Sequence, residues 1–159
     1  MASRGIDILI TYRVIKLLVT PWEKHDAFKF GIIDKDGKVL RKYKSINTPT
    51  QKKAYTMLHR FVFNLKRILQ KIGLKSKLGA FAVALALLIK EDRTYVQHKD
   101  AIESGIVKYL KEHNLYDEYL KEHNEGPEID VAPYITCFGV DVYERDGELV
   151  AENEYAQTL

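Results

Sequence analysis

The 159-residue sequence has few of the residues and runs that define several classes of protein. A single cysteine, Cys137, excludes an internal disulfide and favours a reducing compartment. It stands among apolar residues, which predicts a buried small side chain rather than a nucleophile. The apolar run at 78–89 has about 12 residues, against the roughly 20 that a helix needs to cross a bilayer. The first residues lack the long apolar run and small-residue cleavage site of a signal peptide, so we expect neither secretion nor a membrane span.

Motifs of catalysis and metal binding are also missing. The sequence contains no GxSxG, and the GLKSKLG stretch at 73–79 lacks the GK[ST] of a phosphate-binding loop. His113 and His123 recur in the same local context, but neither belongs to an HExxH pattern that would place two histidines on one helix face. His25 and His98 each lie near an aspartate without the further groups of a catalytic site. We therefore expect no catalytic residue, no metal, no cofactor and no enzymatic activity.

The small net charge of +3 conceals an uneven distribution. Residues 1–91 contain 19 Lys/Arg and 6 Asp/Glu, a net charge of about +13. Residues 92–159 contain 6 Lys/Arg and 16 Asp/Glu, a net charge of about −10. One explanation is that the halves neutralise each other, within one chain or head to tail between copies. The other is that the basic half faces an acidic partner, such as nucleic acid or an acidic protein.

The composition, with 46% hydrophobic and 30% charged residues, is that of a globular domain. We divide it into a basic α+β core domain, residues 1–91, and an acidic helical segment with a C-terminal β-hairpin, residues 92–159, packed on the same domain. Residues 8–19 are apolar and β-branched, and their periodicity does not decide between a strand and a short helix. Alternating apolar residues around the DKDG turn then predict a β-hairpin at 28–43, with Gly37 at positive φ.

A helical hairpin at about 50–90 is the centre of the predicted fold. Thr48 is the expected N-cap and Pro49 the first residue of its first helix. The apolar face of this helix consists of residues spaced three and four apart: Tyr55, Leu58, Val62, Leu65, Leu69 and Ile72. The second helix, 77–90, is apolar on all sides, which indicates burial among other elements.

A further helical region is expected at about 97–124. It contains the hexapeptide YLKEHN twice, at 109–114 and 119–124, and Asn114 is a candidate break between two shorter helices. The segment 134–151 then predicts a second β-hairpin, with RDGE as its turn. The predicted fold class is α+β, a helical hairpin core and a further helical region flanked by two β-hairpins.

Basic residues on the solvent side of the first long helix predict a surface for nucleic acid or an acidic partner. At 100° per residue, four of them fall close together, and two more follow just beyond the helix. Basic residues of the first predicted hairpin, between Lys35 and Lys44, extend this surface, and Tyr43 is available to stack on bases. The candidate site residues are Lys53, Arg60, Arg67, Lys71, Lys75 and Lys77.

Three segments, in a fixed order, carry a resemblance to a known family: ITYRVIKLLVTPWEKHDAFKFGIIDKDGKV, AYTMLHRFVFNLKRIL and SKLGAFAVALALLIKED. Over about residues 10–91 the chain resembles small virion-associated or head-assembly proteins of T-even-type and related tailed bacteriophages, which are similar to prohead core proteins. The resemblance covers roughly half of the chain and implies no catalytic residue.

We therefore expect a non-enzymatic structural or assembly protein of a bacteriophage particle that docks through its basic helix face onto an acidic partner. The expected partners are other phage structural proteins or copies of the chain itself, with DNA as a further candidate and no membrane. The expected localisation is the host cytoplasm during assembly and then the virion. The alternative is a nucleic-acid-binding accessory protein that acts in phage replication or packaging.

Overall fold

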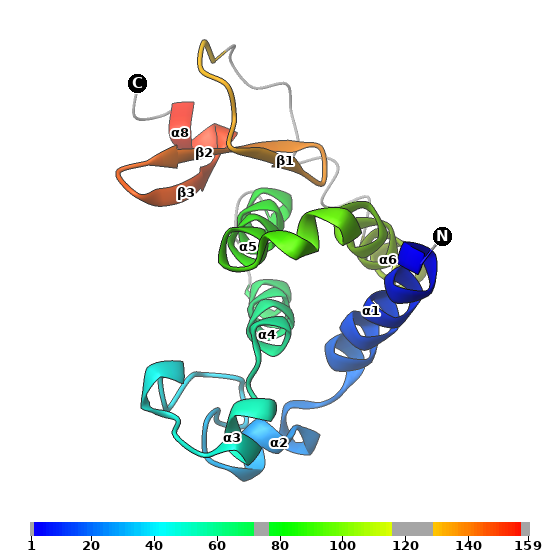
Figure 1. The fold of residues 1–159 in the computed structure, drawn as a ribbon, viewed down its shortest axis with the longest axis vertical. Coiled ribbons are helices and arrows are strands. Elements are labelled where there is room, and N and C mark those ends of the chain that lie inside the picture. The colour runs from blue at the N-terminus through cyan, green and yellow to red at the C-terminus, as the bar shows by residue number, and fades with distance from the viewer. Residues whose placement is uncertain (1, 72–76, 116–128, 157–159) are drawn as a thin grey trace.

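The computed structural model describes residues 2–71, 77–115 and 129–156 (Figure 1). The α-helices are α1 (Ala2–Val19), α2 (Asp26–Lys29), α3 (Pro49–Lys53), α4 (Met57–Gln70), α5 (Lys77–Glu91), α6 (Lys99–Glu112) and α8 (Glu152–Ala156). The 3-10 turns are η1 (Trp22–Lys24), η2 (Tyr43–Ser45) and η3 (Arg93–His98), and the strands are β1 (Ile135–Cys137), β2 (Val140–Arg145) and β3 (Glu148–Ala151). The predicted α+β class is confirmed, with helices mostly preceding one antiparallel sheet.

Helix α5 lies at the centre of the fold, between α4 on one side and the three strands on the other (Figure 1). Helix α1 packs against both α6 and α4. The main core cluster contains side chains from Val14 in α1 to Ala151 in β3, so segments on both sides of residue 91 share one core. Contact on several sides explains why α5 is apolar all round, with Phe81 and Leu85 almost completely buried. No helix in the described ranges is both long and apolar enough to cross a membrane.

The sheet is a meander in the order β1-β2-β3. Each of its turns has two central residues with positive φ, Phe138 (53°) and Gly139 (73°) in the first, and Asp146 (54°) and Gly147 (83°) in the second. Two-residue turns with positive φ at both positions twist in the sense that suits antiparallel strands. The hairpin predicted at 134–151 is therefore confirmed for β2 and β3, and the structure adds β1 as a third strand.

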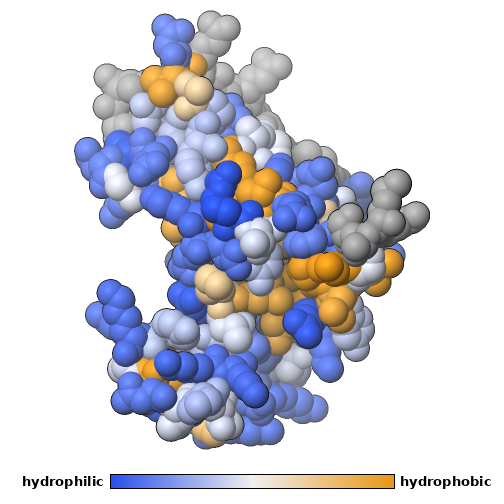
Figure 2. Space-filling view, viewed as in Figure 1, coloured by the Kyte–Doolittle hydropathy of each residue, from blue (hydrophilic) through white to orange (hydrophobic). Residues whose placement is uncertain are grey.

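Residues 8–19, for which periodicity did not decide between helix and strand, belong to α1. Val14 and Leu18 face the core, and Figure 2 shows apolar side chains gathered on the opposite, outer side of the molecule over α1. The crossing with α6 is close, because a Cβ atom on Gly105 would lie 2.5 Å from Thr11 Cγ2. Packing against α6 therefore selects the helix that the sequence pattern leaves ambiguous.

The β-hairpin predicted at 28–43 is wrong. The structure has α2 at its beginning and then a wide loop with a single isolated bridge. Ile32 and Ile33 are neighbours, yet they are 0% and 1% exposed, and both backbone N–H groups donate to the carbonyl of Ala27. Burial of two consecutive side chains does not fit the alternation of a strand that has one face in solvent.

The first helix of the predicted hairpin is interrupted. Thr48 caps α3 as expected, and its hydroxyl accepts a hydrogen bond from Gln51 N–H at 3.4 Å. A new helix begins after Thr56, whose hydroxyl accepts from His59 N–H while its own N–H donates to His59 Nδ1, both at 3.3 Å. Helices α4 and α5 form the predicted pair. Residues 72–76, which connect them, lie outside the described residues.

The described part of the third helical region agrees with the prediction of a helix that breaks at Asn114. Helix α6 ends at Glu112, and Asn114 takes a left-handed backbone with φ 58°, which confirms it as the end of the helix. The second YLKEHN copy, at 119–124, lies outside the described residues.

Candidate docking surface

A second, smaller hydrophobic cluster holds residues 20–56 against α4. We call this segment the loop lobe. Phe63 of α4 is fully buried at its centre, with its ring edge-on to Trp22 at 5.4 Å between centroids and stacked on Tyr55 at 6.1 Å. The cluster consists of Trp22, Ala27, Ile32, Ile33, Ile46, Tyr55 and Phe63.

The DKDG turn of the loop lobe is hydrogen-bonded to side chains from the C-terminal part of α4. The Arg67 guanidinium donates to the Gly37 carbonyl at 2.8 Å, and the Gln70 amide donates to the Asp36 carbonyl at 3.3 Å. Gly37 has φ 83°, as predicted, and a Cβ atom there would lie 2.4 Å from Trp22 Cζ2. Within the turn, hydrogen bonds to the Asp34 carboxylate, first that from the Lys38 N–H, lower the pKa of Asp34. The turn is therefore held by its own hydrogen bonds and by hydrogen bonds to α4.

The predicted basic residues do not form one continuous stripe. Lys53 and Lys71 are exposed, but the break between α3 and α4 places them on separate elements. Arg67 is half-buried and engaged with the DKDG turn. Lys77 is buried in the first turn of α5, and Lys75 lies outside the described residues. Binding by these residues stays a prediction.

Arg60, the remaining predicted site residue, connects the loop lobe to α5. Its guanidinium lies 4.5 Å from the centroid of the Tyr43 ring and 3.2 Å from a carboxylate oxygen of Glu91. Its Nε is buried without a hydrogen-bond partner. Arg60 also lines a pocket between α4 and α5, which we call the α4–α5 groove. The groove is lined by Met57, Arg60, Phe61, Asn64, Ala84, Leu87, Leu88 and Glu91.

The loop lobe carries the densest positive charge of the described residues. Residues 38–53, which we call the basic surface, contain six Lys/Arg and no Asp/Glu. Leu40 (56% exposed) and Tyr43 (40%) lie among these charges. All five lysines are exposed, and Arg41 is half-buried with a hydrogen bond to Gln51 Oε1 at 3.0 Å. The basic residues are Lys38, Arg41, Lys42, Lys44, Lys52 and Lys53.

The sheet end carries the opposite charge. Residues 129–156 contain seven Asp/Glu and one Lys/Arg. Three of the carboxylates, Glu144, Asp146 and Glu148, are exposed around the β2–β3 turn, and we call this turn with its flanking residues the acidic hairpin. Lys90 of α5 pairs with Glu144 at 3.5 Å. Among the ion pairs of the described residues, none joins the basic surface to the sheet end, so the two charges do not neutralise each other there.

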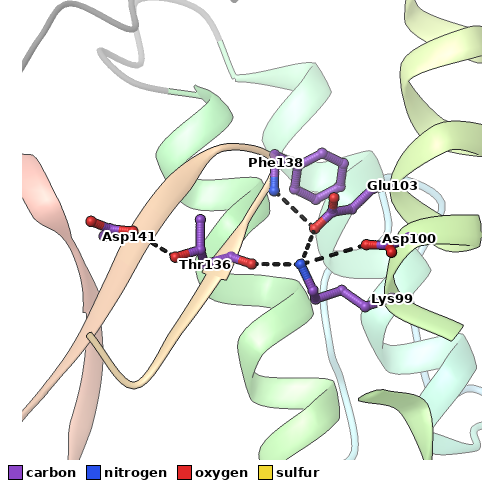
Figure 3. Close-up of polar contacts among 6 residues, drawn as sticks. All are labelled: Lys99, Asp100, Glu103, Thr136, Phe138 and Asp141. Atoms are coloured by element: carbon purple, nitrogen blue, oxygen red, sulfur yellow. Dashed lines mark hydrogen bonds and ion pairs between the residues drawn. The ribbon is translucent and has the colours of Figure 1, made fainter. Parts of the chain in front are cut away.

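A polar cluster fixes the sheet to α6 (Figure 3). The Lys99 ammonium donates to the Thr136 carbonyl at 2.8 Å and pairs with Glu103 at 3.3 Å. Glu103 Oε1 in turn accepts from the Phe138 N–H at 3.0 Å, and the Thr136 hydroxyl donates to Asp141 at 2.6 Å. The groups of this cluster are engaged with one another, which gives it a structural role between the first turn of α6 and the β1–β2 turn.

Two contacts of buried histidines were not predicted from the sequence. His25 Nε2 lies 3.3 Å from Lys66 Nζ, and Lys66 donates to the Thr20 carbonyl and lies 4.0 Å from the Trp22 ring centroid. Burial, followed by the charge of Lys66, lowers the pKa of His25 to about 4. Burial lowers the pKa of Lys66 to about 8. His98 contacts the carboxylate of Asp7 in α1. Each contact joins segments far apart in the sequence, and no local pattern signals it.

The described residues contain no group of three or more His, Cys, Asp or Glu placed to hold a metal ion. Cys137 is fully buried, as predicted, and burial together with the nearby Glu103 carboxylate raises the pKa of its thiol to about 12. A thiol of this pKa stays protonated at neutral pH and is a poor nucleophile.

In comparisons with known proteins, no family model, no curated protein and no solved structure matches this chain. The charged surfaces described above are therefore the observations from which function is inferred.

Proposed function

We propose that this chain is a non-enzymatic assembly protein of a bacteriophage particle that docks onto an acidic partner through the basic surface. The observation that carries the proposal is the gathering of six basic side chains, without one acidic residue, on residues 38–53. The basic surface replaces the solvent face of α4 as the main docking region, because Arg67 is bonded to the Gly37 carbonyl and Lys77 is buried.

The basic surface has the composition of a binding site for an acidic partner. Like charges that are close together repel each other, so an oppositely charged partner relieves an energetic cost of the free molecule. Leu40 and Tyr43 add exposed apolar and aromatic area between the charges, and such residues contribute affinity once water is excluded. The loop lobe beneath the surface is packed on α4, and a surface that is already ordered loses less entropy on binding.

The phage context of the proposal rests on the resemblance over about residues 10–91, and most of the basic surface lies between the first two of the segments that carry it. On that basis the partners are other structural proteins of the particle or further copies of the chain. The sites of action are then the host cytoplasm during assembly and the particle itself.

The test is co-sedimentation of the protein with precursor heads and mature particles of the phage that encodes it. We expect a fixed copy number per particle, lost when three lysines of the basic surface are reversed. The lobe-reversed variant carries Lys42→Glu, Lys44→Glu and Lys53→Glu, all at exposed positions.

A matched control makes the same change in net charge at exposed positions outside the basic surface, with Lys16→Glu, Lys24→Glu and Lys108→Glu. We expect this control to co-sediment like the wild type. Absence of the wild-type protein from precursor heads and from mature particles alike would contradict the proposal.

The second candidate, a nucleic-acid-binding accessory protein, is favoured by Tyr43, which lies among the lysines where a base could stack. Fluorescence anisotropy with single-stranded and duplex DNA over a series of salt concentrations tests it. Affinity that falls steeply with salt, and that is lost in the lobe-reversed variant, would support DNA as the partner.

A further inference from the structure

We infer that the acidic partner of the basic surface is a second copy of this chain. The basic surface of each copy docks on the acidic hairpin of the other, in a two-fold symmetric dimer. This inference rests on the proposed function and names the partner that the basic surface binds.

The two charged surfaces lie on the same edge of the molecule. In Figure 1 the β2–β3 turn projects to the left at the top, and η2, within the basic surface, projects to the left below. Figure 2 shows this left edge hollowed between the sheet end above and the loop lobe below. A partner that enters the hollow therefore meets positive charge at one end and negative charge at the other.

Side-chain contacts place the α4–α5 groove between the two surfaces. On the lobe side, Arg60 of the groove lies against Tyr43 and pairs with Glu91. On the sheet side, the neighbouring residue of α5, Lys90, pairs with Glu144 of the acidic hairpin. The basic surface, the groove and the acidic hairpin thus follow one another along a single edge.

A two-fold axis through this edge makes the arrangement self-complementary. Rotation by 180° brings the basic surface of one copy opposite the acidic hairpin of the other, and the same contact forms a second time on the far side of the axis. The charges are opposite in sign, with six basic and no acidic residues at 38–53 against the three exposed carboxylates of the acidic hairpin. Two copies placed side by side in the same direction would instead bring like charges together.

The same arrangement argues against nucleic acid in the hollow. A phosphate backbone drawn to the basic surface would also approach Glu144, Asp146 and Glu148, and like charges brought together at an interface are unfavourable. A second copy instead brings an acidic hairpin to the basic surface and a basic surface to the acidic hairpin. Leu87 (41% exposed), which lines the groove, and Leu40 (56%) supply apolar area between the charged contacts.

Mixing two charge-neutralised variants tests the inference. The lobe-neutral variant carries Lys42→Gln, Lys44→Gln and Lys53→Gln. The hairpin-neutral variant carries Glu144→Gln, Asp146→Asn and Glu148→Gln, and asparagine at 146 tolerates the positive φ of that position. Sedimentation velocity over a range of protein and salt concentrations measures the association, and circular dichroism verifies that each variant is folded.

We expect a dimer of the wild type at low salt that dissociates as salt is raised. Each variant alone should show a dissociation constant raised about 10- to 100-fold, because both symmetric contacts lose three charges from one side. An equimolar mixture should recover heterodimers, since the hairpin-neutral copy keeps its basic surface and the lobe-neutral copy keeps its acidic hairpin. A control with Lys16→Gln, Lys24→Gln and Lys108→Gln should dimerise like the wild type.

A wild type that stays monomeric at low salt and high protein concentration overturns the inference, as does either neutral variant that dimerises like the wild type. If the wild type is monomeric but still co-sediments with particles through the basic surface, the inference fails and the proposed function stands. If substitutions in the basic surface change neither dimerisation nor co-sedimentation with particles, the inference and the proposed function both fail.

Discussion

The loop lobe and the sheet end each cover a central helix with a small apolar layer, but they hold their backbones in different ways. In the sheet end, a regular ladder of backbone hydrogen bonds joins β1 to β2 and β2 to β3. In the loop lobe, side chains from α4 take over part of this role, with Arg67 and Gln70 bonded to carbonyls of the DKDG turn. The conformation of the loop lobe therefore depends more on individual side chains, whereas that of the sheet end depends more on backbone pairing.

The largest expected effect comes from removing the aromatic ring at the centre of the loop lobe. Phe63→Ala should lower the free energy of unfolding by about 3–5 kcal/mol, because Phe63 is fully buried. Trp22, the single tryptophan of the chain, lies in the same cluster, so its fluorescence reports on the loop lobe. In urea, the fluorescence transition of Phe63→Ala should precede the far-UV circular dichroism transition.

The matched control is Phe81→Ala, which removes an equally buried ring from α5 beside the sheet end. Its two transitions should move together to lower urea. Coincident transitions in Phe63→Ala would show that the loop lobe does not unfold separately.

Acidification should weaken the loop lobe through His25. The native pKa of His25 is lowered to about 4 from an ordinary value of 6.5, so between these values the unfolded chain binds more protons than the native one. Stability should therefore fall as the pH falls from 6.5 to 4, by up to about 3 kcal/mol from this residue. His25→Gln should flatten this part of the pH profile in urea titrations relative to the wild type. An equal slope in His25→Gln would contradict the assignment.

Alanine substitutions at one glycine of the loop lobe and one of the sheet end distinguish the cost of backbone strain from the cost of overpacking. Gly37 and Gly147 both have φ 83°, but a Cβ atom on Gly37 meets the Trp22 ring at 2.4 Å, whereas one on Gly147 meets nothing within 4 Å. Gly147→Ala should cost about 1 kcal/mol from backbone strain. Gly37→Ala should cost about 1–2 kcal/mol more, from overpacking against the ring. Equal losses in thermal or urea denaturation would mean that the loop lobe accommodates the methyl group.

The smallest expected effect is on the reactivity of Cys137, a reporter of the sheet end. Its buried thiol, with a pKa raised to about 12, should react with a thiol reagent at pH 8 only when the sheet end opens. Gly147→Ala should raise the labelling rate, and Gly37→Ala should change it by less than about twofold if the two ends open independently. A comparable increase in both variants would show that they open together.

The helices α4 and α5 and the beginning of α3 were predictable because their signals are local. The apolar steps around Leu58 and Leu65, the uncharged run of α5 and the cap at Thr48 each act within a few residues. The turn at Gly37 was predictable for the same reason. The hairpin around it was not, because Ile32 and Ile33 are both buried by distant partners such as Phe63, and their contacts override the local alternation.

The candidate docking surface also depends partly on local signals and partly on tertiary contacts. The basic residues were visible in the sequence, but their grouping depends on the break at Thr56 and on the burial of Lys77, which tertiary structure determines. The contact between His25 and Lys66 joins the lobe to α4 across 41 positions, so neither residue signals it alone. The lowered pKa values of both groups follow from burial and not from composition.

Lys90 and Glu91 are consecutive residues at the end of α5, and each forms an ion pair on the side of a different charged surface. Glu91 binds Arg60, which lies against Tyr43 of the loop lobe, and Lys90 binds Glu144 of the acidic hairpin. Both charged surfaces are therefore connected through side chains to adjacent residues at the end of one helix. A molecule that engages both surfaces must therefore match the distance between them as well as their charges.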